Sequence, residues 1–152
     1  MDTLEDICHI PVRFSEIDSM RCAWHGSYVA YLEDGRESFG RRYPGIGYAD
    51  MQQAGIYAPL YDLHLTYRAP LRLNDVAEVH TRYVPRPGAR LDYEYRIYRA
   101  ADHTLCAEAK SVQLFIDPQG KLMVDEPDYY RLWKARWLHP QAADGSDTTP
   151  LR

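Results

Sequence analysis

The sequence predicts an α+β fold in which helices lie on one face of an antiparallel sheet. Three observations predict it. One long amphipathic helix is expected near the start of the chain, and a shorter helix follows it. After the helices come several segments in which apolar and polar residues alternate, as in strands that bury one face. Turns rich in Pro, Gly and Asp separate these segments. One long helix wrapped by a curved antiparallel sheet satisfies this order.

The length and composition fit one folded domain. The chain has 152 residues, of which 45% are hydrophobic, so a core can form. We assign the domain to residues 1–138 and expect the polar segment 139–152, which contains Pro and Gly, to be a disordered tail. No apolar run reaches the roughly 18 residues that span a bilayer. The acidic N-terminus does not resemble a secretory signal, so we expect a cytoplasmic protein.

Charge and cysteine content exclude some classes of function. The formal net charge is -4 and the pI is about 5.8, which argues against a nucleic-acid partner. The cysteines, Cys8, Cys22 and Cys106, are odd in number and widely spaced, as expected for reduced thiols. No zinc-binding spacing is present, and we expect neither a metal nor a cofactor.

The first elements are a strand and the long helix. Residues 7–15 alternate like a strand, and residues 27–43 carry an apolar stripe at helical spacing. Ser27 is a competent N-cap, and Pro44 follows the predicted end of the helix. Gly35 lies on the apolar stripe at a cost in helix propensity, so we expect the helix to approach the sheet closely there.

The remaining elements are a short helix, a run of strands and a terminal helix. They are expected at residues 48–54, 61–67, 76–84, 90–99, 104–116, 121–124 and 127–137. One face of the strand at 104–116 carries Ala107, Ala109 and Ser111, small residues that would let a helix lie close.

The stretch from Ser15 to Arg36 organises the chain. Asp18 lies on the loop before the long helix, and His25 lies at the helix mouth. An acid facing the amide-rich end of a helix is a plausible catalytic arrangement. The alternative for Asp18 is a loop acid that caps the helix or faces solvent, and for His25 a structural role. Glu16 is the rival acid, although its position favours a role in ending the first strand.

These residues resemble a known family. Strand, loop and helix resemble the hotdog-fold acyl-CoA thioesterases through Asp18, His25, Tyr28, Tyr31, Glu33 and Arg36. The 4-hydroxybenzoyl-CoA thioesterase branch and its Tol-Pal-associated relatives are the most similar, because they carry an aspartate seven positions before the residue at the helix mouth. The segment 67–71, with Asp75, resembles the family's Tyr-x-x-Pro-Leu turn. Ser27 stands at the usual asparagine position.

The resemblance implies hydrolysis of acyl-CoA thioesters to a free acid and CoA. Asp18 would act as nucleophile or as general base, and the resemblance leaves both open. Backbone amides at His25 and Gly26 would stabilise the oxyanion. The His25 side chain, expected to be neutral near a helix N-terminus, would add a hydrogen bond or position water.

Further side chains are candidates for substrate contacts. The set combines residues of the helix mouth with a cluster of arginines around one predicted hairpin that could meet phosphates: Trp24, Ser27, Tyr28, Arg82, Arg86 and Arg90. The alternative for the arginines is a solvated hairpin face. Glu33 needs weighing, because another hotdog branch uses a helical glutamate, and we favour a supporting role for it. We interpret Cys22 as a packing residue and Tyr31 as a core or interface residue.

The resemblance also implies assembly. Family members pair so that each site borrows residues from its partner, so we expect a homodimer or homotetramer. Three other functions remain open: a thioesterase for acyl-carrier-protein substrates in a fatty-acid or polyketide-like pathway, an acyl-thioester dehydratase, and a non-catalytic acyl-CoA-binding protein.

Overall fold

The structure, a computed structural model, describes residues 3–138. Its elements in chain order are β1 (Glu5–Pro11), the 3₁₀ turn η1 (Phe14–Glu16), α1 (Ser27–Arg42), α2 (Tyr48–Ala54), β2 (Leu60–Tyr67), β3 (Val76–Val84), β4 (Arg90–Arg99), β5 (Thr104–Leu114) and α3 (Asp128–Leu138). The tail predicted at residues 139–152 lies outside the described residues. Within residues 3–138, none of the helices has the length and hydropathy to cross a bilayer.

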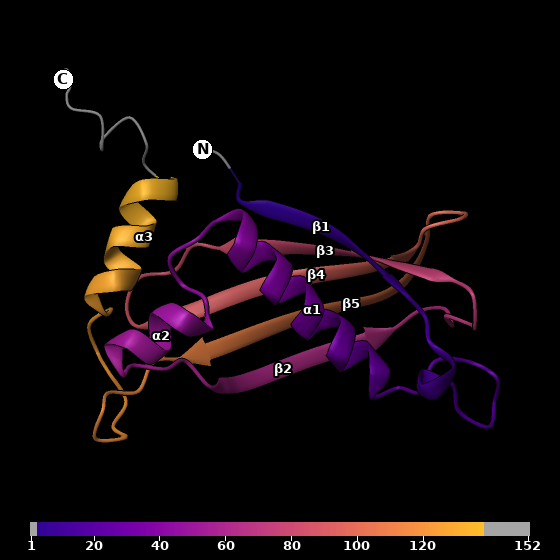
Figure 1. The fold of residues 1–152 in the computed structure, drawn as a ribbon, viewed down its shortest axis with the longest axis horizontal. Coiled ribbons are helices and arrows are strands. Elements are labelled where there is room, and N and C mark those ends of the chain that lie inside the picture. The colour runs from indigo at the N-terminus through magenta and orange to yellow at the C-terminus, as the bar shows by residue number, and fades with distance from the viewer. Residues whose placement is uncertain (1–2, 139–152) are drawn as a thin grey trace, which may run out of the picture.

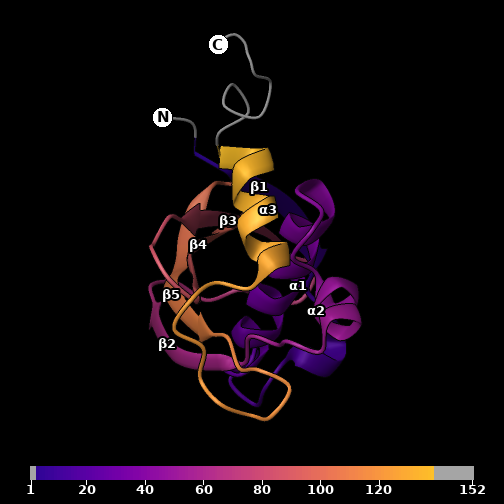
Figure 2. The same ribbon diagram turned by 90° about the vertical axis from the view of Figure 1, so that its left-hand side faces the viewer.

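The five strands form one antiparallel sheet in the order β1-β3-β4-β5-β2. Helix α1 crosses one face of this sheet diagonally, and α2 and α3 lie at the end where β3 finishes (Figure 1). Seen end-on, the sheet curves around α1 (Figure 2). The predicted α+β fold, one long helix wrapped by an antiparallel sheet, is confirmed.

Most predicted elements have nearly the expected bounds. β3 and β4 begin and end at the predicted residues, and β2, β5, α1 and α3 do so within two residues. Alternation is the reason, because β3 buries every second residue from Ala77 to Tyr83. A strand whose inner face is this regular permits one register only.

The first strand ends earlier than predicted. β1 stops at Pro11, and the alternating residues that follow form η1 instead. The Glu16 carboxylate accepts hydrogen bonds from the backbone N–H of Arg13 at 2.9 Å and from its guanidinium at 2.8 Å, which closes a tight turn. Phe14, an apolar residue of the predicted strand, is therefore 79% exposed.

The predicted strand at residues 121–124 is also wrong. This segment makes only an isolated bridge between Leu122 and Ile116. The carboxylate of Asp117 accepts from the backbone N–H groups of Gln119 and Lys121, both at 2.9 Å. These bonds hold the chain in a compact turn, which leaves too few residues for a ladder.

Gly35 brings α1 into direct contact with the sheet, as predicted. A Cβ atom at this position would lie 2.6 Å from Oγ1 of Thr81 and 2.8 Å from Cγ1 of Val79, both on β3. The closest approach therefore falls on β3 and not on the small residues of β5, Ala107 and Ala109. Both contacted side chains are fully buried and β-branched, so they have little freedom to move aside.

We expect Gly35→Ala to lower the free energy of unfolding by about 1–3 kcal/mol, because overpacking outweighs the better helix propensity of alanine. Urea denaturation followed by circular dichroism measures this change. Gly40→Ala is the matched control on the same helix, since no atom lies within 4 Å of the added Cβ. It should leave stability unchanged or raise it by up to about 1 kcal/mol. Equal effects of the two substitutions would contradict the close contact.

Candidate active site

The loop between η1 and α1 folds back on itself and carries Asp18. The Asp18 backbone N–H donates to the carbonyl of Cys22 at 2.9 Å, and the Asp18 carbonyl accepts from Arg21 N–H at 3.1 Å. Ile17 and Ala23 pair across the base of this turn. Arg21 takes a positive φ of 66°, a conformation that costs energy for a side chain of this type. The turn thus holds Asp18 in one place.

The half-buried carboxylate of Asp18 has one positioned oxygen and one available oxygen. Oδ1 accepts from the backbone N–H of Met20 at 2.8 Å, and Sγ of Cys22 lies 4.0 Å from it. Oδ2 has no hydrogen-bond partner among residues 3–138. A carboxylate oriented through one oxygen is able to attack or to deprotonate water through the other. The half-buried Cys22 packs beside it, which agrees with the packing role we expected.

The helix mouth differs in one detail from the prediction. Gly26 occupies the N-cap position and Ser27 is the first residue of α1. The buried Ser27 hydroxyl donates to the carbonyl of Glu16 at 3.2 Å and caps no helix amide. No acceptor among residues 3–138 takes the backbone N–H of His25 or Gly26. Two amide donors are therefore available at the positive end of the helix dipole, as an oxyanion requires.

Two tyrosines fasten the helix mouth to the segment that follows β2. Tyr67 donates to the carbonyl of His25 at 2.7 Å. The buried hydroxyl of Tyr28 accepts from the backbone N–H of Leu71 at 3.1 Å, and the Leu71 carbonyl accepts from Ala23 N–H at 2.7 Å. The Tyr28 hydroxyl thus has a structural role in the core, and its role as a substrate contact stays a prediction. The Tyr-x-x-Pro-Leu turn thus supports the loop that carries Asp18.

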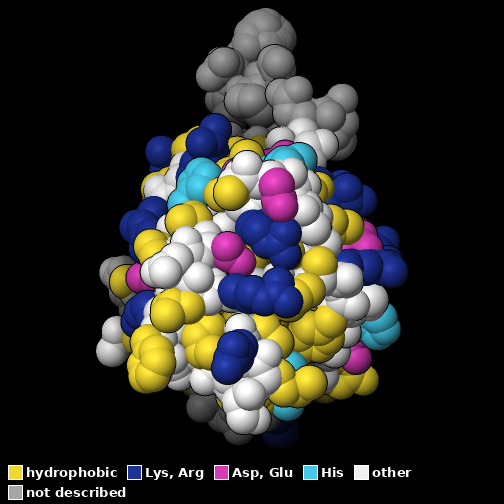
Figure 3. Space-filling model, turned by 90° about the vertical axis from the view of Figure 1, so that its right-hand side faces the viewer, with side chains coloured by type: hydrophobic (Ala, Val, Ile, Leu, Met, Phe, Trp, Pro, Cys, Tyr) yellow, Lys and Arg dark blue, Asp and Glu magenta, His cyan; other side chains and the backbone are white. Residues whose placement is uncertain are grey.

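The surface around the helix mouth is apolar and basic. The Trp24 ring lies 4.9 Å from the exposed His25 ring, between centroids, and covers Gly26 so closely that a Cβ there would lie 2.1 Å from it. Trp24 is 52% exposed and Met20 is 79% exposed. Hydrophobic side chains mix with Lys and Arg side chains on this end of the molecule (Figure 3). Such a surface suits a ligand with an apolar portion and a phosphate-bearing portion.

The rival acid Glu16 is a structural residue. Its carboxylate accepts from Arg13 and from the hydroxyl of Tyr31 at 2.8 Å, and the Tyr31 side chain is completely buried. Burial on its own raises the pKa of Glu16, but the hydrogen bonds from Arg13 and Tyr31 outweigh it and lower the pKa below its usual value near 4.5. Glu16 anchors the loop to α1, and the sequence offered no signal that it would bond to Tyr31.

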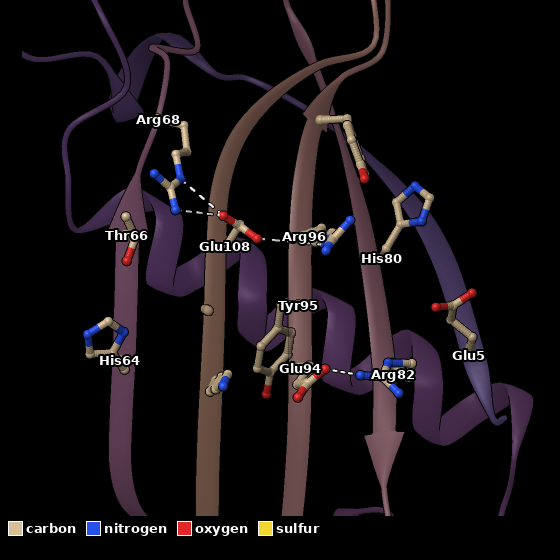
Figure 4. A pocket seen from close by; sticks show the side chains of 13 residues that line it. Glu5, His64, Thr66, Arg68, His80, Arg82, Glu94, Tyr95, Arg96 and Glu108 are labelled. Carbon is tan, nitrogen blue, oxygen red and sulfur yellow. Dashed lines mark hydrogen bonds and ion pairs between the residues drawn. The ribbon is translucent and has the colours of Figure 1, made fainter.

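The hairpin arginines do not join Asp18 within this protomer. Arg82 lies on the outer face of the sheet, where it pairs with Glu94, and α1 runs behind the opposite face (Figure 4). Arg86 follows the end of β3, and Arg90 begins β4 opposite that end. Both pair with Asp92. The Asp18 loop instead bonds to Leu71, in the segment that leads into the other end of β3, and β3 is about 25 Å long at 3.3 Å per residue.

A groove that the sequence did not predict lies between α1, α2 and the inner face of the sheet. Its volume is about 760 Å³. Apolar residues line most of it, including Tyr48, Met51, Tyr57, Leu91 and Ile116. Glu33 lies on its rim, paired with Arg36, which agrees with a supporting role for this helical glutamate.

The groove also contains Tyr93 of β4 and Gln113 of β5. No residue of the Asp18 loop lines it, since its first contribution from α1 is Glu33. Glu33 lies eight residues beyond His25, about 12 Å along the helix axis. One sequence signal could have identified the groove: Gln113 is a polar residue at an inward position of an alternating strand. No group of three or more His, Cys, Asp or Glu side chains within residues 3–138 is arranged to hold a metal ion.

Sequence comparisons identify relatives. The family model described as "Thioesterase-like superfamily" matches residues 12–138. A Bacillus subtilis protein named "Putative acyl-CoA thioesterase YneP" is 32% identical over 111 residues, which cover 73% of this chain and 79% of that protein. The "Acyl-CoA thioester hydrolase YbgC" of Escherichia coli O157:H7 is 30% identical over 110 residues, which cover 71% of this chain and 81% of that protein.

Structure comparisons agree on the fold. The crystal structure of the hypothetical protein TT1821 from Thermus thermophilus has a TM-score of 0.75 and 32% identity, covering 85% of this chain and 97% of that chain. Slr0204, a 1,4-dihydroxy-2-naphthoyl-CoA thioesterase from Synechocystis, has a TM-score of 0.78 at 17% identity, covering 90% of this chain and 99% of that chain. At that identity the second likeness concerns the fold alone.

The lowered pKa of Glu16 predicts part of the protein's acid sensitivity. A carboxyl group whose pKa is lower in the folded state stabilises the fold above its unfolded-state pKa, and this stabilisation is lost as the pH falls through the folded-state value. We expect Glu16→Gln to be less stable than wild type at neutral pH, with a smaller further loss between about pH 5 and pH 3.

Urea denaturation at a series of pH values measures both effects. Tyr31→Phe is the matched variant, because it removes one of the hydrogen bonds that lower the pKa and leaves those from Arg13. Its pH dependence should lie between those of wild type and Glu16→Gln. Identical acid slopes for wild type and Glu16→Gln would show that Glu16 does not hold the loop through its charge.

Proposed function

Because the chain belongs to the thioesterase-like superfamily and adopts its hotdog fold, we propose that it hydrolyses acyl-CoA thioesters to the free acid and CoA. One observation carries the proposal. A carboxylate oriented through a single oxygen, Asp18, precedes a helix mouth whose His25 and Gly26 amides have no acceptor among residues 3–138. Acyl transfer needs these two components, a group that attacks or activates water and donors for the oxyanion.

The reaction divides between these components. Asp18 either attacks the thioester carbonyl, giving an anhydride that water then opens, or removes a proton from the attacking water. In both routes the carbonyl oxygen becomes an oxyanion, which the amides of His25 and Gly26 stabilise through hydrogen bonds. The C–S bond then breaks, and CoA leaves as a thiolate that takes up a proton. Trp24 covers one side of this position and limits the access of solvent.

We place the chain closest to the 4-hydroxybenzoyl-CoA and Tol-Pal-associated branch. The spacing from Asp18 to His25 and the Tyr67 to Leu71 turn support this placement, and so does the similarity to the Escherichia coli thioester hydrolase. Cytoplasmic location is part of the proposal, supported by three cysteines that are free: Cys8, Cys22 and Cys106.

We expect Asp18→Asn to lower kcat by about 10²–10⁴-fold without changing the thermal stability. Release of free CoA thiol from a panel of acyl-CoA substrates measures the rate. Asp128→Asn is the matched control, since it makes the same change on the exposed first turn of α3. Unchanged turnover by Asp18→Asn would remove Asp18 from the mechanism. Tight binding of acyl-CoA by wild type without release of thiol would favour a non-catalytic binding protein. A change in enoyl absorbance without release of thiol would favour a dehydratase.

We further propose that the active unit is a dimer formed through β2. This strand lies at the edge of the sheet, pairs only with β5 among the described strands and exposes Leu60, Tyr61 and Tyr67. An exposed, apolar edge strand favours pairing with a second copy. A tetramer would require further contacts between such dimers.

Two-fold pairing of β2 would complete the site. When a strand pairs antiparallel with its own copy, the end of one strand meets the start of the other. Tyr67, at the end of β2, is bonded to His25 in the catalytic loop. Leu60, at the start, directly follows Ala58 and Pro59, which line the groove. The partner's Asp18 would then stand at the groove of the first protomer.

The proposed pairing also indicates which of the hairpin arginines could contact the substrate. Arg86 and Arg90 lie at the end of the sheet that the pairing brings toward the partner's catalytic loop. We retain these two as candidate contacts for the CoA phosphates. Arg82 lies on the outer face, away from α1, and we exclude it (Figure 4).

Subunit complementation tests the shared site. Gly40→Trp should block the groove, because Gly40 lines it and no atom lies within 4 Å of the added Cβ, which leaves room for the side chain to begin there. We expect Gly40→Trp and Asp18→Asn to be inactive separately. Co-expressed with different affinity tags, they should recover about a quarter of wild-type activity, since half of the dimers are mixed and each holds one intact site. No recovery in purified mixed dimers would place acid and groove in the same chain.

A further inference from the structure

The hydroxyl of Tyr67 binds the peptide group that carries the Gly26 amide. It donates a hydrogen bond to the backbone carbonyl of His25 at 2.7 Å. That carbonyl and the N–H of Gly26 belong to one planar peptide unit, which is trans, as are all peptide bonds within residues 3–138. In a trans peptide the C=O and the N–H point in opposite directions. A group that holds the carbonyl therefore also determines where the amide donor points.

A second contact restrains the same peptide from the side of Gly26. The indole of Trp24 lies over Gly26 so closely that a Cβ atom there would lie 2.1 Å from it. The Trp24 carbonyl accepts from the backbone N–H of Ser27 at 2.8 Å, which closes the turn that begins α1. With the indole beside it and the phenol at its carbonyl end, the His25–Gly26 peptide has little freedom to rotate. The N–H of Gly26, which has no acceptor among residues 3–138, consequently keeps one direction.

The Tyr67 phenol is itself oriented by the core. Its ring contacts the ring of Tyr28 edge to face, with centroids 5.0 Å apart and planes at 82°. Tyr28 is buried, and its hydroxyl accepts from the backbone N–H of Leu71. Burial raises the pKa of Tyr67, so the phenol keeps its proton at neutral pH and remains a donor. The bond to the His25 carbonyl thus comes from a donor whose place is fixed by a buried neighbour.

A hydrogen bond at the carbonyl also changes the strength of the amide at the other end of the peptide. Hydrogen-bonded groups polarise one another, so a peptide whose carbonyl accepts a bond donates more strongly through its N–H, by about 10–30% per bond. Amide donors that are oriented in advance stabilise a developing oxyanion more than the neutral carbonyl of the ground state. The bond from Tyr67 therefore acts more on the rate of the chemical step than on substrate binding.

We propose that Tyr67 is a positioning residue for thioester hydrolysis: through the His25 carbonyl it orients and polarises the Gly26 amide that stabilises the oxyanion. This inference rests on the proposed thioesterase function, in which the amides at the helix mouth receive the thioester oxygen. Tyr67 does not contact the substrate in this role. It acts through the peptide that separates it from the reacting carbonyl, so its contribution is the same for every acyl group.

The first test is the variant Tyr67→Phe, which removes the hydroxyl and keeps the ring that packs on Tyr28. We expect kcat to fall about tenfold for each acyl-CoA in a panel, with little change in KM, because one oriented hydrogen bond is lost. Release of free CoA thiol measures both constants. The matched control is Tyr43→Phe, which removes a bond of the same type, from a tyrosine hydroxyl to the carbonyl of Glu5, at the opposite end of α1. It should leave both constants unchanged.

The second test observes the thioester carbonyl directly by infrared spectroscopy. An acyl-CoA isotopically labelled at the carbonyl carbon, bound to the slowed Asp18→Asn variant, should show a lower stretching frequency than in free solution, because the amides polarise the C=O bond. Adding Tyr67→Phe should reduce this shift, whereas adding Tyr43→Phe should not.

Other results would overturn the inference. A purely structural role for Tyr67 would lower the thermal stability and leave kcat and the carbonyl frequency unchanged. A direct contact with the substrate would change KM or the ranking of acyl groups. If wild type releases no thiol from any substrate, the thioesterase proposal fails. The carbonyl shift of intact acyl-CoA bound to wild type and to Tyr67→Phe then decides the inference separately, and equal shifts or no binding at all would contradict it.

Discussion

The contact between Gly35 of α1 and Val79 and Thr81 of β3 determines where the rest of the site can lie. A helix is a stiff element, so its height above the sheet and its direction follow from the point at which it touches. With no side chain at Gly35, α1 lies directly on β3, and its N-terminal mouth projects past the sheet edge toward the end of β2. A larger residue would lift the helix and displace the amides of His25 and Gly26 from Asp18.

Hydrogen bonds from both sides of the loop hold it in place, while Asp18 Oδ2 and the amides of His25 and Gly26 stay without a described partner. Glu16 bonds to the exposed guanidinium of Arg13 and to the buried Tyr31, and the buried hydroxyl of Tyr28 bonds to Leu71. These bonds restrain the loop, and they offset the energy of the positive φ of Arg21. The groove also contains polar groups without a described partner: the buried side-chain carbonyl of Gln113 and the hydroxyl of Tyr93. Polar groups that hydrogen-bond to each other keep the loop in its conformation, whereas polar groups without a partner are available to bind a ligand.

The sequence predicted the fold, and the places of Asp18 on the loop and His25 at the helix mouth, better than their surroundings, for physical reasons. β3 and β4 follow from alternation, and the Asp18 to His25 spacing depends on local chain geometry. The role of Glu16 depends on its hydrogen bond from Tyr31, fifteen residues away. The sequence alone could not show this bond, so it left Glu16 as a rival to Asp18 for the role of catalytic acid. The cluster of Arg82, Arg86 and Arg90 was visible in the sequence, but strand register and pairing with acids decide which face and which end they occupy. Register also joins Tyr93 to Gln113, twenty residues later.

The separation of acid and groove connects the chemistry to the edge of the sheet. Within one protomer, Asp18 lies at the start of α1, while the groove begins about 12 Å farther along the helix. A short acyl group cannot occupy both positions in one chain. The exposed edge of β2, otherwise a liability for aggregation, carries the catalytic loop at one end and the groove at the other. In the proposed dimer, pairing of this edge with its copy would satisfy the unpaired backbone, cover the apolar side chains of Leu60 and Tyr61, and bring each acid to a groove. If these three gains share one interface, the loss of pairing removes catalysis together with the assembly.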